Sequence, residues 1–504
     1  MADIDISAPA LSAAAQVFVD RGKHQLFIDG QWVDALSSAT FETRDPATAA
    51  VIGEVARAAA EDVDLAVSAA RKAFDIGPWR KMTPMERSGT LNKIADLMEA
   101  NIDELAELET LDQGKPLHVG RWAEIPGAIA QFRYFAGLAL AIEGRTIPTS
   151  INYQPEGKEI FAYTLKQPVG VVGAIVPWNS PLVLTVMKLA PALAAGCTIV
   201  LKPAEDTSLT AVRLVELMAE AGLPDGVINL VTGFGSEAGA RLAEHPQVNK
   251  IAFTGSTNTG RAILEASKSN LKRVTLELGG KSPVIVMPDA DIAAAAAGSA
   301  NAIFFNGGQV CVAGSRLYAH RSVFDKVIEG VVEAASEMVM GHGLNPATQL
   351  GPLVSKKHAA TVAGYIDDGL KAGATVLCGG KTMGANESFV QPTVLTDVKA
   401  DMNVVREEIF GPVLVATPFD DIDEVVTAAN DSNFGLAAGI WTEGLSNAMT
   451  LANRLQAGTV WINSHLMFDA ALPIGGTKQS GFGRDSGQAA LDNYLELKTV
   501  CAVV

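Results

Sequence analysis

The sequence predicts an α/β protein with two lobes, each built on an open parallel sheet, and a small β region outside both. The chain has 504 residues, about three times the usual domain length of roughly 150 residues, so more than one domain is expected. Along most of it, short β-branched runs alternate with amphipathic helical patterns, which is typical of parallel sheets covered by helices. Two segments, 144–167 and the C-terminal tail, do not fit this alternation.

The first alternating series runs from about Pro168 to Leu278. Its strand candidates are 169–176, 197–202, 227–231, 250–254 and 274–278. Helix candidates lie between them at 182–196, 207–222, 236–245 and 256–269. We expect Thr207 or Ser208 to be the N-cap of the second helix, because a hydroxyl there can accept a hydrogen bond from the first turn.

A second series begins at the strand candidate 283–287 and predicts the other lobe. It continues through segments with strand or helix character at 315–320, 322–338, 358–373, 413–419 and 458–463. Segment 144–167 has the polar alternation of a hairpin, and the tail 491–504 reads as an apolar strand. An exposed hairpin and an apolar strand need covering, and a partner subunit is a plausible cover.

Composition and charge exclude several classes of protein. Lys and Arg total 39 against 56 Asp and Glu, a net charge of −17, so neither a nucleic-acid surface nor binding to an anionic membrane is expected. The hydrophobic fraction of 48% is too high for a disordered chain. The N-terminus is acidic and lacks a basic region followed by an apolar core, so no signal peptide is expected.

Cysteine usage points to a reducing compartment. The four cysteines are far apart and have no metal-ligand spacing, so we expect no metal site and no disulfide framework: Cys197, Cys311, Cys378 and Cys501. Free thiols and a cytoplasmic location are the default expectation.

Two long runs contain no charged residue. They are 167–187, with 21 residues, and 292–315, with 24 residues, and such lengths are typical of membrane spans. The first run, however, contains Pro177 and Asn179, and the second contains Asn306 and Gln309, which are poor residues for a lipid-facing helix. We interpret both runs as buried segments of a protein without a membrane span.

Open parallel sheets bind ligands at the carboxyl ends of their strands, so the residues that follow each strand candidate are the first to inspect. Those residues are Pro177-Trp178-Asn179, Lys202 to Glu205, Gly233-Phe234-Gly235, Gly255-Ser256 and Gly279-Gly280. Glycines permit close backbone approach, and lysine and glutamate can bond ribose hydroxyls, so the set suits a nucleotide. The segment GFGSEAG does not match GxGxxG, and ordinary turn glycines explain it equally well.

Cys311 and Glu277 are the candidates for covalent and acid–base chemistry. Cys311 follows a charge-free helical run that breaks at Gly307-Gly308, and its Asn, Gln and Gly neighbours are not core material. It is either a nucleophile or, like most free cysteines, a small buried hydrophobe. Glu277 lies in the apolar strand VTLEL and either faces solvent or is a buried base with a raised pKa.

Motifs distributed along the chain carry a family resemblance. They are PWN (177–179), KPAE (202–205), FTGST (253–257), LELGGKSP (276–283), FFNGGQVCVAGSR (304–316), EEIFGPV (407–413), GTVWIN (458–463) and GGTKQSGFGRD (475–485). In order and spacing they resemble the aldehyde dehydrogenase superfamily, from about residue 27 to the last strand. The resemblance implies a Rossmann-like NAD-binding domain (1–143 and 168–279), a catalytic α/β domain (280–478) and a small β oligomerisation domain (144–167 and 488–504) in a homotetramer, a dimer of dimers.

The resemblance also implies roles for the catalytic candidates. Cys311 matches the nucleophile, which forms a thiohemiacetal and then a thioester with the aldehyde. Asn179, with the Cys311 N–H, matches the oxyanion hole. Glu277 matches the base that activates the hydrolytic water, and Lys188 joins the catalytic set.

Cofactor contacts are implied in the same way. The matching residues are Val176, Pro177, Trp178, Lys202, Glu205, Gly235, Gly255, Ser256, Leu278, Glu408 and Phe410. Lys202 and Glu205 match the adenosine ribose site, Glu408 the nicotinamide ribose site and Phe410 the nicotinamide ring. We expect NAD to be preferred over NADP, because Glu205 would repel a 2′-phosphate.

The positions that line the substrate tunnel of relatives are uncharged in this chain: Ser180, Leu184, Met187, Val310, Val312, Phe468 and Ile474. The tunnel is therefore expected to favour an apolar aldehyde. Many relatives have larger aromatic residues at Ser180 and Met187, so the tunnel is wide enough for an arylalkyl group. Segment 462–485 resembles that of bacterial phenylacetaldehyde dehydrogenases. The open alternatives are a broad-range enzyme, a CoA-acylating enzyme and an inactive structural relative.

Overall fold

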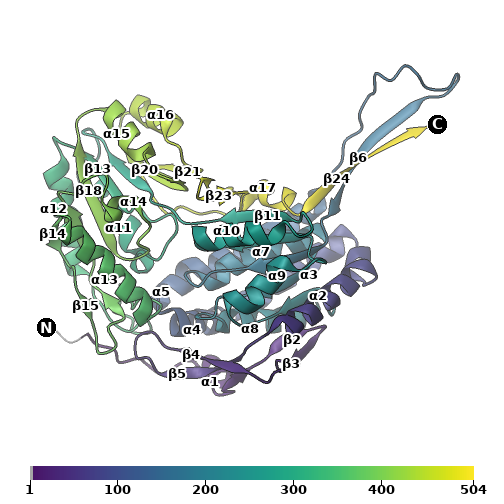
Figure 1. Cartoon of the computed structure of the whole chain (residues 1–504), viewed down its shortest axis with the longest axis horizontal. Coiled ribbons are helices and arrows are strands. Elements are labelled where there is room, and N and C mark those ends of the chain that lie inside the picture. The colour runs from purple at the N-terminus through teal and green to yellow at the C-terminus, as the bar shows by residue number, and fades with distance from the viewer. Residues whose placement is uncertain (1–3) are drawn as a thin grey trace.

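The computed structural model describes residues 4–504 and has two α/β lobes and a projecting β arm (Figure 1). One lobe, at the centre right of the view, contains an 8-stranded sheet, and the other, mostly green at the left, contains a 7-stranded sheet. This arrangement confirms the predicted fold class.

The first sheet has the strand order β23-β11-β10-β7-β8-β9-β2-β3. Its central strands are parallel: β7 (Val171–Ile175), β8 (Thr198–Lys202), β9 (Ile228–Leu230), β10 (Lys250–Thr254) and β11 (Arg273–Glu277). Antiparallel strands occupy its edges: β2 (Leu26–Ile28), β3 (Gln31–Val33) and β23 (Gly481–Phe482). The chain order reverses between β7 and β10, where an open sheet forms a crevice for a ligand.

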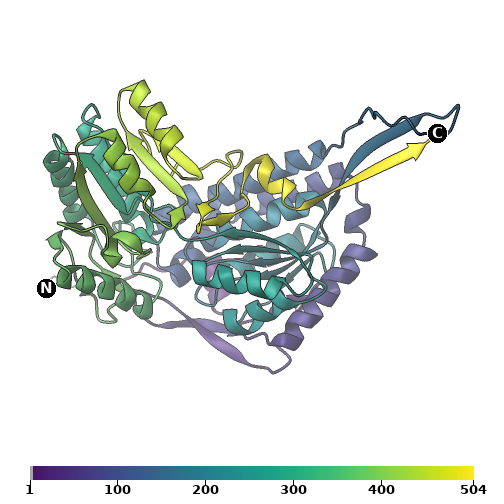
Figure 2. The same cartoon turned by 45° about the horizontal axis from the view of Figure 1, so that its top comes forward.

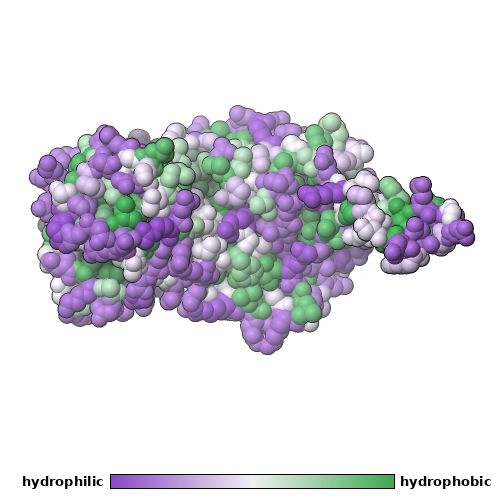
Figure 3. Space-filling view, turned by 90° about the horizontal axis from the view of Figure 1, so that it is seen from above, coloured by the Kyte–Doolittle hydropathy of each residue, from purple (hydrophilic) through white to green (hydrophobic). Residues whose placement is uncertain are grey.

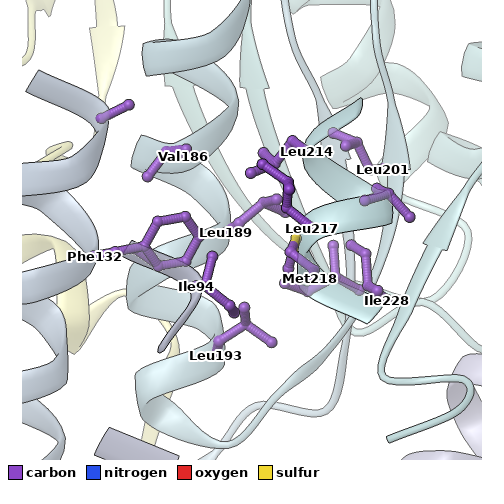
Figure 4. Packing of buried hydrophobic residues seen from close by; sticks show 14 of the residues in the cluster. Ile94, Phe132, Val186, Leu189, Leu193, Leu201, Leu214, Leu217, Met218 and Ile228 are labelled. Carbon is purple, nitrogen blue, oxygen red and sulfur yellow. The ribbon is translucent and has the colours of Figure 1, made fainter. Parts of the chain in front are cut away.

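Helices cover both faces of this sheet because its central strands are apolar on both sides. Val172, Ala174 and Leu201 belong to one core with the following helices: α3 (Pro84–Ala100), α4 (Ile102–Gln113), α6 (Ile125–Leu138), α7 (Pro181–Ala195) and α8 (Leu209–Glu220). Figure 4 shows Phe132, Leu189 and Leu217 of this core packed together. The opposite face packs against α2 (Ala60–Asp75), α9 (Ala240–Glu244) and α10 (Thr257–Ser267).

The N-cap of α8 is Ser208, one of the two predicted residues, but its side chain does not cap the helix. Ser208 occupies the N-cap position, but its Oγ donates a hydrogen bond to the Ala204 carbonyl at 3.0 Å. The Leu209 N–H donates instead to Asp112 Oδ2 at 2.9 Å. A carboxylate on α4 therefore caps α8, and this tertiary contact replaces the local hydroxyl cap.

The second sheet has the order β14-β17-β18-β13-β12-β20-β21. Its strands are β12 (Pro283–Val286), β13 (Arg316–His320), β14 (Thr375–Cys378), β17 (Thr393–Thr396), β18 (Val413–Phe419), β20 (Ala437–Trp441) and β21 (Thr459–Ile462). All neighbours are parallel except β14 and β17. The helices of this lobe are α11 (Ile292–Phe304), α12 (Phe324–Glu337), α13 (Lys356–Lys371), α14 (Asn403–Arg406), α15 (Ile422–Asn430) and α16 (Leu445–Arg454).

The arm joins two segments that are distant in sequence. Strand β6 (Ile160–Pro168) pairs antiparallel with β24 (Leu495–Val503) along its whole length, and Figure 2 shows the pair extending away from the lobes. The hairpin expected within 144–167 is reduced to one bridge between Thr146 and Tyr163. The prolines at 148 and 155 remove backbone donors from its first half.

Short elements complete residues 4–504. They are α1 (Ala13–Val19), β1 (Lys23–His24), β4 (Thr40–Arg44), β5 (Val51–Ala56), α5 (Leu117–Val119), the π-helical turn η2 (Gly120–Glu124), β15 (Thr382–Met383), β16 (Phe389–Val390), β19 (Phe434–Gly435), β22 (Thr477–Lys478) and α17 (Gly487–Asp492), together with the 3₁₀ turns η1 (Trp79–Lys81) and η3 (Ala139–Ala141). Within this described part, no helix has the length and apolar character that a membrane span requires. The surface is mostly hydrophilic, with scattered apolar patches on the lobes and on the arm (Figure 3).

Candidate active site

The loop between β7 and α7 connects the two lobes through Asn179. Its side chain is only 4% exposed, and its Nδ2 donates a hydrogen bond to the Gln309 carbonyl at 2.9 Å. In return, Asn306 Nδ2 donates to the Asn179 carbonyl at 2.9 Å. These reciprocal bonds place Asn179 against the loop that leads to Cys311.

The Cys311 loop has a backbone that depends on its glycines. Helix α11 ends at Phe304, and the turn η5 (Phe305–Gly308) contains positive φ angles at Asn306, Gly307 and Gly308. A Cβ on Gly308 would lie 2.1 Å from the Gly411 carbonyl oxygen, so only glycine fits there. The buried Gln309 side chain then fixes the loop, since its Oε1 accepts the Val354 N–H at 2.9 Å.

The Cys311 side chain is half-buried among apolar residues. It packs with Val310, Val312, Trp461 and Ile474. Burial, followed by the nearby Glu408 and Glu277 carboxylates, raises the pKa of its thiol to about 12. At neutral pH the thiol is therefore protonated in this arrangement, and a base must take its proton before it can act as a nucleophile.

Glu277 is buried, which resolves the alternative of a solvent-facing residue. It ends β11 and is only 8% exposed, and its Oε1 has no hydrogen-bond partner among residues 4–504. Burial raises its pKa well above the ordinary range, and the negative charge of Asp485 raises it further. A Cβ on Gly475 would lie 2.6 Å from this oxygen, so the 475 position must be glycine if the carboxyl is to remain there.

Lys188 of α7 is completely buried and lies near enough to Glu277 for its charge to lower the pKa of that carboxyl. Its Nζ forms an ion pair with Asp485. The Asp485 N–H donates to the Ile474 carbonyl, and the Ile474 N–H donates to the Asp485 carbonyl, both at 2.8 Å. Asp485 thus joins α7 to the Cys311 cluster. We did not identify it from the sequence, because it stands 297 positions from Lys188.

The candidate adenosine-ribose contacts lie at the carboxyl end of β8. Lys202 is 2% exposed, and its Nζ lies 3.1 Å from Glu205 Oε2. Burial lowers the pKa of this lysine, although Glu205 partly offsets the effect. Ser256 caps α10 by accepting the Thr259 N–H at 3.2 Å. The remaining candidates near these strand ends are Val176, Pro177, Gly235, Gly255 and Leu278, of which Val176 and Leu278 are buried and Gly235 is exposed.

Glu408 and Phe410 lie on the loop before β18. Glu408 Oε1 accepts the Gly280 N–H at 3.0 Å, and burial raises its pKa to about 7. A Cβ on Gly279 would lie 2.0 Å from Glu408 Oε2, so the glycine pair provides the space for this carboxyl. Phe410 has φ of 58°, and its ring meets Trp178 edge to face at a centroid distance of 5.2 Å.

His358 supports Phe410 and was not among the sequence candidates. Its Nε2 lies 2.7 Å from the Phe410 carbonyl oxygen, and its ring packs against Trp178 at a centroid distance of 5.1 Å. Burial lowers the pKa of its imidazole. The neutral ring fits a role in holding the Phe410 backbone.

The expected substrate residues form two groups. Val310, Val312 and Ile474 pack with Cys311, and Phe468 joins them by packing edge to face on Trp461, with ring centroids 5.8 Å apart. The second group lies at the start of α7, where Ser180 is the N-cap residue and Leu184 and Met187 belong to the first two turns.

One charged residue next to the expected substrate residues was not predicted from the sequence. Ser180 Oγ donates a hydrogen bond to Glu124 Oε1 at 2.9 Å. Glu124 belongs to η2, and nothing in the local sequence pattern relates it to Ser180. The expectation of an uncharged lining holds for the named positions, but not for their immediate surroundings.

Comparisons with known proteins agree with this arrangement. The model of the Aldehyde dehydrogenase family matches residues 32–500. A phenylacetaldehyde dehydrogenase of Pseudomonas fluorescens is 49% identical over 479 residues, which cover 95% of each chain. Aldehyde dehydrogenase family 2 member C4 of Arabidopsis thaliana is 48% identical over 477 residues, which cover 94% of each chain.

Solved structures show the same likeness in three dimensions. The NAD+ complex of an aldehyde dehydrogenase from Bacillus cereus has a TM-score of 0.96 to this chain at 47% identity, covering 99% of this chain and 100% of that chain. The family resemblance predicted from the motifs is confirmed: this chain belongs to the aldehyde dehydrogenase family.

Proposed function

We propose that this protein oxidises an apolar aldehyde to the carboxylic acid with NAD as the hydride acceptor. The observation that carries the proposal is the convergence of Asn179, Cys311 and Glu277, which come from both lobes, around one half-buried thiol. An amide donor, a nucleophile and a buried base in one place are the parts that acyl-transfer chemistry on an aldehyde needs.

Cys311 is the proposed nucleophile. Its sulfur bonds to the aldehyde carbon while its thiol proton passes through solvent water to the carbonyl oxygen, which gives a thiohemiacetal. With NAD bound, loss of a hydride from that carbon and of the hydroxyl proton to water would leave a thioester. Asn179 Nδ2 uses one hydrogen for the Gln309 carbonyl and has a second hydrogen available for the developing oxyanion. The Cys311 N–H is the proposed second donor. Because Asn179 is held on both its side chain and its carbonyl, the donor needs no reorganisation when charge develops.

Glu277 is the proposed base. Its unpartnered Oε1 can accept a proton from water. That water attacks the thioester carbon, the carbon–sulfur bond breaks, and the acid leaves as the Cys311 sulfur regains a proton. Lys188 is proposed to act on Glu277 together with Asp485, with which it forms a buried ion pair. Burial has the largest effect on the pKa of Glu277, which Asp485 raises further and Lys188 lowers.

The cofactor residues fit NAD. The buried Lys202 Nζ has one carboxylate contact and two further donors, and Glu205 can accept the ribose hydroxyls. The Gly279–Gly280 backbone leaves Glu408 space and a fixed orientation for the second ribose, and Phe410 lies beside the expected ring position. NAD, when bound, supplies the acceptor for the hydride. The NAD+ complex of the Bacillus cereus neighbour supports this assignment.

Phenylacetaldehyde is the proposed substrate. The apolar group around Cys311 and the moderate size of Ser180 and Met187 support an arylalkyl aldehyde, as does the Pseudomonas fluorescens relative. A broad-range aldehyde dehydrogenase is the second candidate, because the Arabidopsis relative is similar to almost the same degree under a general name. The presence of Glu277 disfavours a CoA-acylating enzyme, and the intact set of three residues disfavours an inactive relative.

We further propose the domain division expected from the resemblance, with NAD-binding segments 1–143 and 168–279, a catalytic segment 280–478, and oligomerisation segments 144–167 and 488–504. The arm exposes Phe161 by 48% and Leu497 by 66%, which supports a homotetramer in which partner subunits cover these side chains. Light scattering on the purified protein tests the tetramer.

The deciding experiment measures NADH formation with aryl, aliphatic, semialdehyde and amino aldehydes, with NAD or NADP, and with or without CoA. We expect phenylacetaldehyde and NAD to give the highest kcat/KM without a requirement for CoA. The Cys311→Ala variant is expected to form no NADH, and Cys378→Ala is the matched control. Full turnover by Cys311→Ala would refute the assignment of the nucleophile.

A further inference from the structure

A cluster of buried charged side chains lies next to the N-terminal end of α7. Lys115 Nζ lies 2.5 Å from Glu109 Oε1 and 3.3 Å from Glu124 Oε1, and the Lys115 and Glu109 side chains have no exposed surface. Burial raises the pKa of Glu109 to about 7. The two carboxylates outweigh the effect of burial on Lys115 and raise its pKa. Lys115 therefore pairs with both carboxylates of the cluster, Glu109 and Glu124.

One carboxylate oxygen of Glu124 has no hydrogen-bond partner in the described part of the chain. Glu124 is 7% exposed, and this oxygen, Oε2, is buried. Leaving a buried carboxylate oxygen unpaired costs free energy. The residue ends the π-helical turn η2, and such turns are rare and frequent at functional sites. The turn and the unpaired oxygen both indicate that Glu124 binds a ligand group.

Ser180 connects Glu124 to the residues that are expected to line the substrate tunnel. It directly follows Asn179, is half-buried, and is the N-cap residue of the helix α7 that carries Leu184 and Met187. Its hydroxyl proton is donated to Glu124 Oε1, so the lone pairs of its oxygen remain free to accept. Two acceptor oxygens therefore lie next to the residues expected to line the substrate tunnel: Ser180 Oγ, which is half-buried, and behind it the unpaired Glu124 Oε2.

The substrate preference proposed next rests on the proposed oxidation of arylalkyl aldehydes by this protein. We propose that Ser180 and Glu124 form an acceptor pair that selects aldehydes carrying a hydroxyl group on the aryl ring. A hydroxyl supplies the donor that both oxygens lack. A neutral donor suits this pair better than an ammonium group, because an ammonium group would bring a second cation close to Lys115, whose Nζ lies 3.3 Å from Glu124 Oε1, and would have to lose its water shell there.

The test compares each ring isomer of hydroxyphenylacetaldehyde with the methyl analogue of the same isomer, which has nearly the same size and no donor. We expect the wild-type kcat/KM to be about tenfold higher for one hydroxyl isomer than for its methyl analogue, as for one satisfied hydrogen bond. Ser180→Ala and Glu124→Gln are each expected to bring this ratio close to one. Ser88→Ala, which removes a buried hydroxyl on α3, is the matched control and should leave the ratio unchanged.

Each outcome decides between specific alternatives. Equal kcat/KM for all hydroxyl and methyl pairs, or an unchanged ratio in Ser180→Ala, overturns the acceptor pair. Preference for an aminomethyl analogue over the hydroxyl isomers overturns the choice of a neutral donor. If Glu124→Gln fails to fold, Ser180→Ala alone still decides. Absence of NADH with every aldehyde refutes the proposed function itself, whereas oxidation of phenylacetaldehyde without a hydroxyl preference refutes only the acceptor pair.

Discussion

Replacement of Glu277 by Gln separates acylation from deacylation. The change keeps the size of the side chain and removes the ability to take a proton from water. The carboxyl is 8% exposed and close to Gly475, so no other side chain can move in to replace it. Since general-base catalysis contributes about 10²–10⁴-fold, we expect the steady-state rate of NADH formation to fall by that factor.

The assay is stopped-flow NADH fluorescence with enzyme at micromolar concentration. Glu277→Gln is expected to retain a burst close to one NADH per active site, because hydride transfer precedes thioester hydrolysis. Glu265→Gln on the exposed face of α10 is the matched control and should behave as the wild type. Loss of the burst in Glu277→Gln would refute the reasoning and would show that Glu277 acts before the thioester forms.

The pH dependence of the deacylation rate is a second test of the role of Glu277 as the base. Burial and Asp485 raise the pKa of Glu277 well above the ordinary range, and only the ionised form is a base. The deacylation rate of the wild type is therefore expected to rise with pH through this raised pKa, which lies above the roughly 4.3 of a free glutamate. In Glu277→Gln this rise should disappear, and a persistent rise would assign it to another group.

Three further predictions concern the surrounding residues. Asn179→Ala is expected to lower kcat about 10²–10³-fold in the same NADH assay, and an unchanged kcat would exclude it from the oxyanion hole. Lys188→Met leaves Asp485 buried without its cation and is expected to lower the free energy of unfolding by about 3–5 kcal/mol, measured by urea denaturation; a change near zero would show that the pair contributes nothing net. Glu205→Gln removes the charge that opposes a 2′-phosphate, so the kcat/KM ratio of NADP to NAD should rise, and an unchanged ratio would mean that another residue sets cofactor choice.

Local patterns in the sequence were sufficient to predict most of the fold. The β-branched runs 169–176 and 250–254 contain β7 and β10, whose residues are all buried, as expected for central strands of a sheet that helices cover on both faces. The same local reasoning predicted the N-cap position of α8 but failed to identify the acceptor of the Leu209 N–H, which is Asp112 of another helix and not the side chain of the N-cap residue Ser208. It also failed at the arm, where β6 pairs with the distant β24. In both cases, the deciding partner is far away in sequence.

In the candidate site too, some residues could be recognised from their local sequence, and others are defined only by contacts with distant segments. Cys311 was recognisable from its glycine-rich, charge-free neighbourhood, and Glu277 from its place in an apolar strand. Asp485, His358 and Glu124 were not recognisable, because each is defined by one contact with a residue on another element. The strand and loop motifs therefore supplied the candidates for the reacting groups, while the groups that surround and position them required the three-dimensional structure.

The two charge-free runs of the sequence now have a structural explanation. Each run ends at a buried cation: Lys188 follows the first and is 0% exposed, and Arg316 follows the second and is 3% exposed. Each cation is compensated from elsewhere, Lys188 by Asp485 and Arg316 by the carbonyl oxygens of Lys281 and Ala429. Asn179 and Asn306, each 4% exposed, lie in buried parts of these runs, whereas Ala293, Ala294 and Ala297 of α11 are exposed. In buried surroundings the attraction between an amide donor and an oxyanion is stronger than in water. The charged groups that surround these uncharged runs come from other parts of the chain.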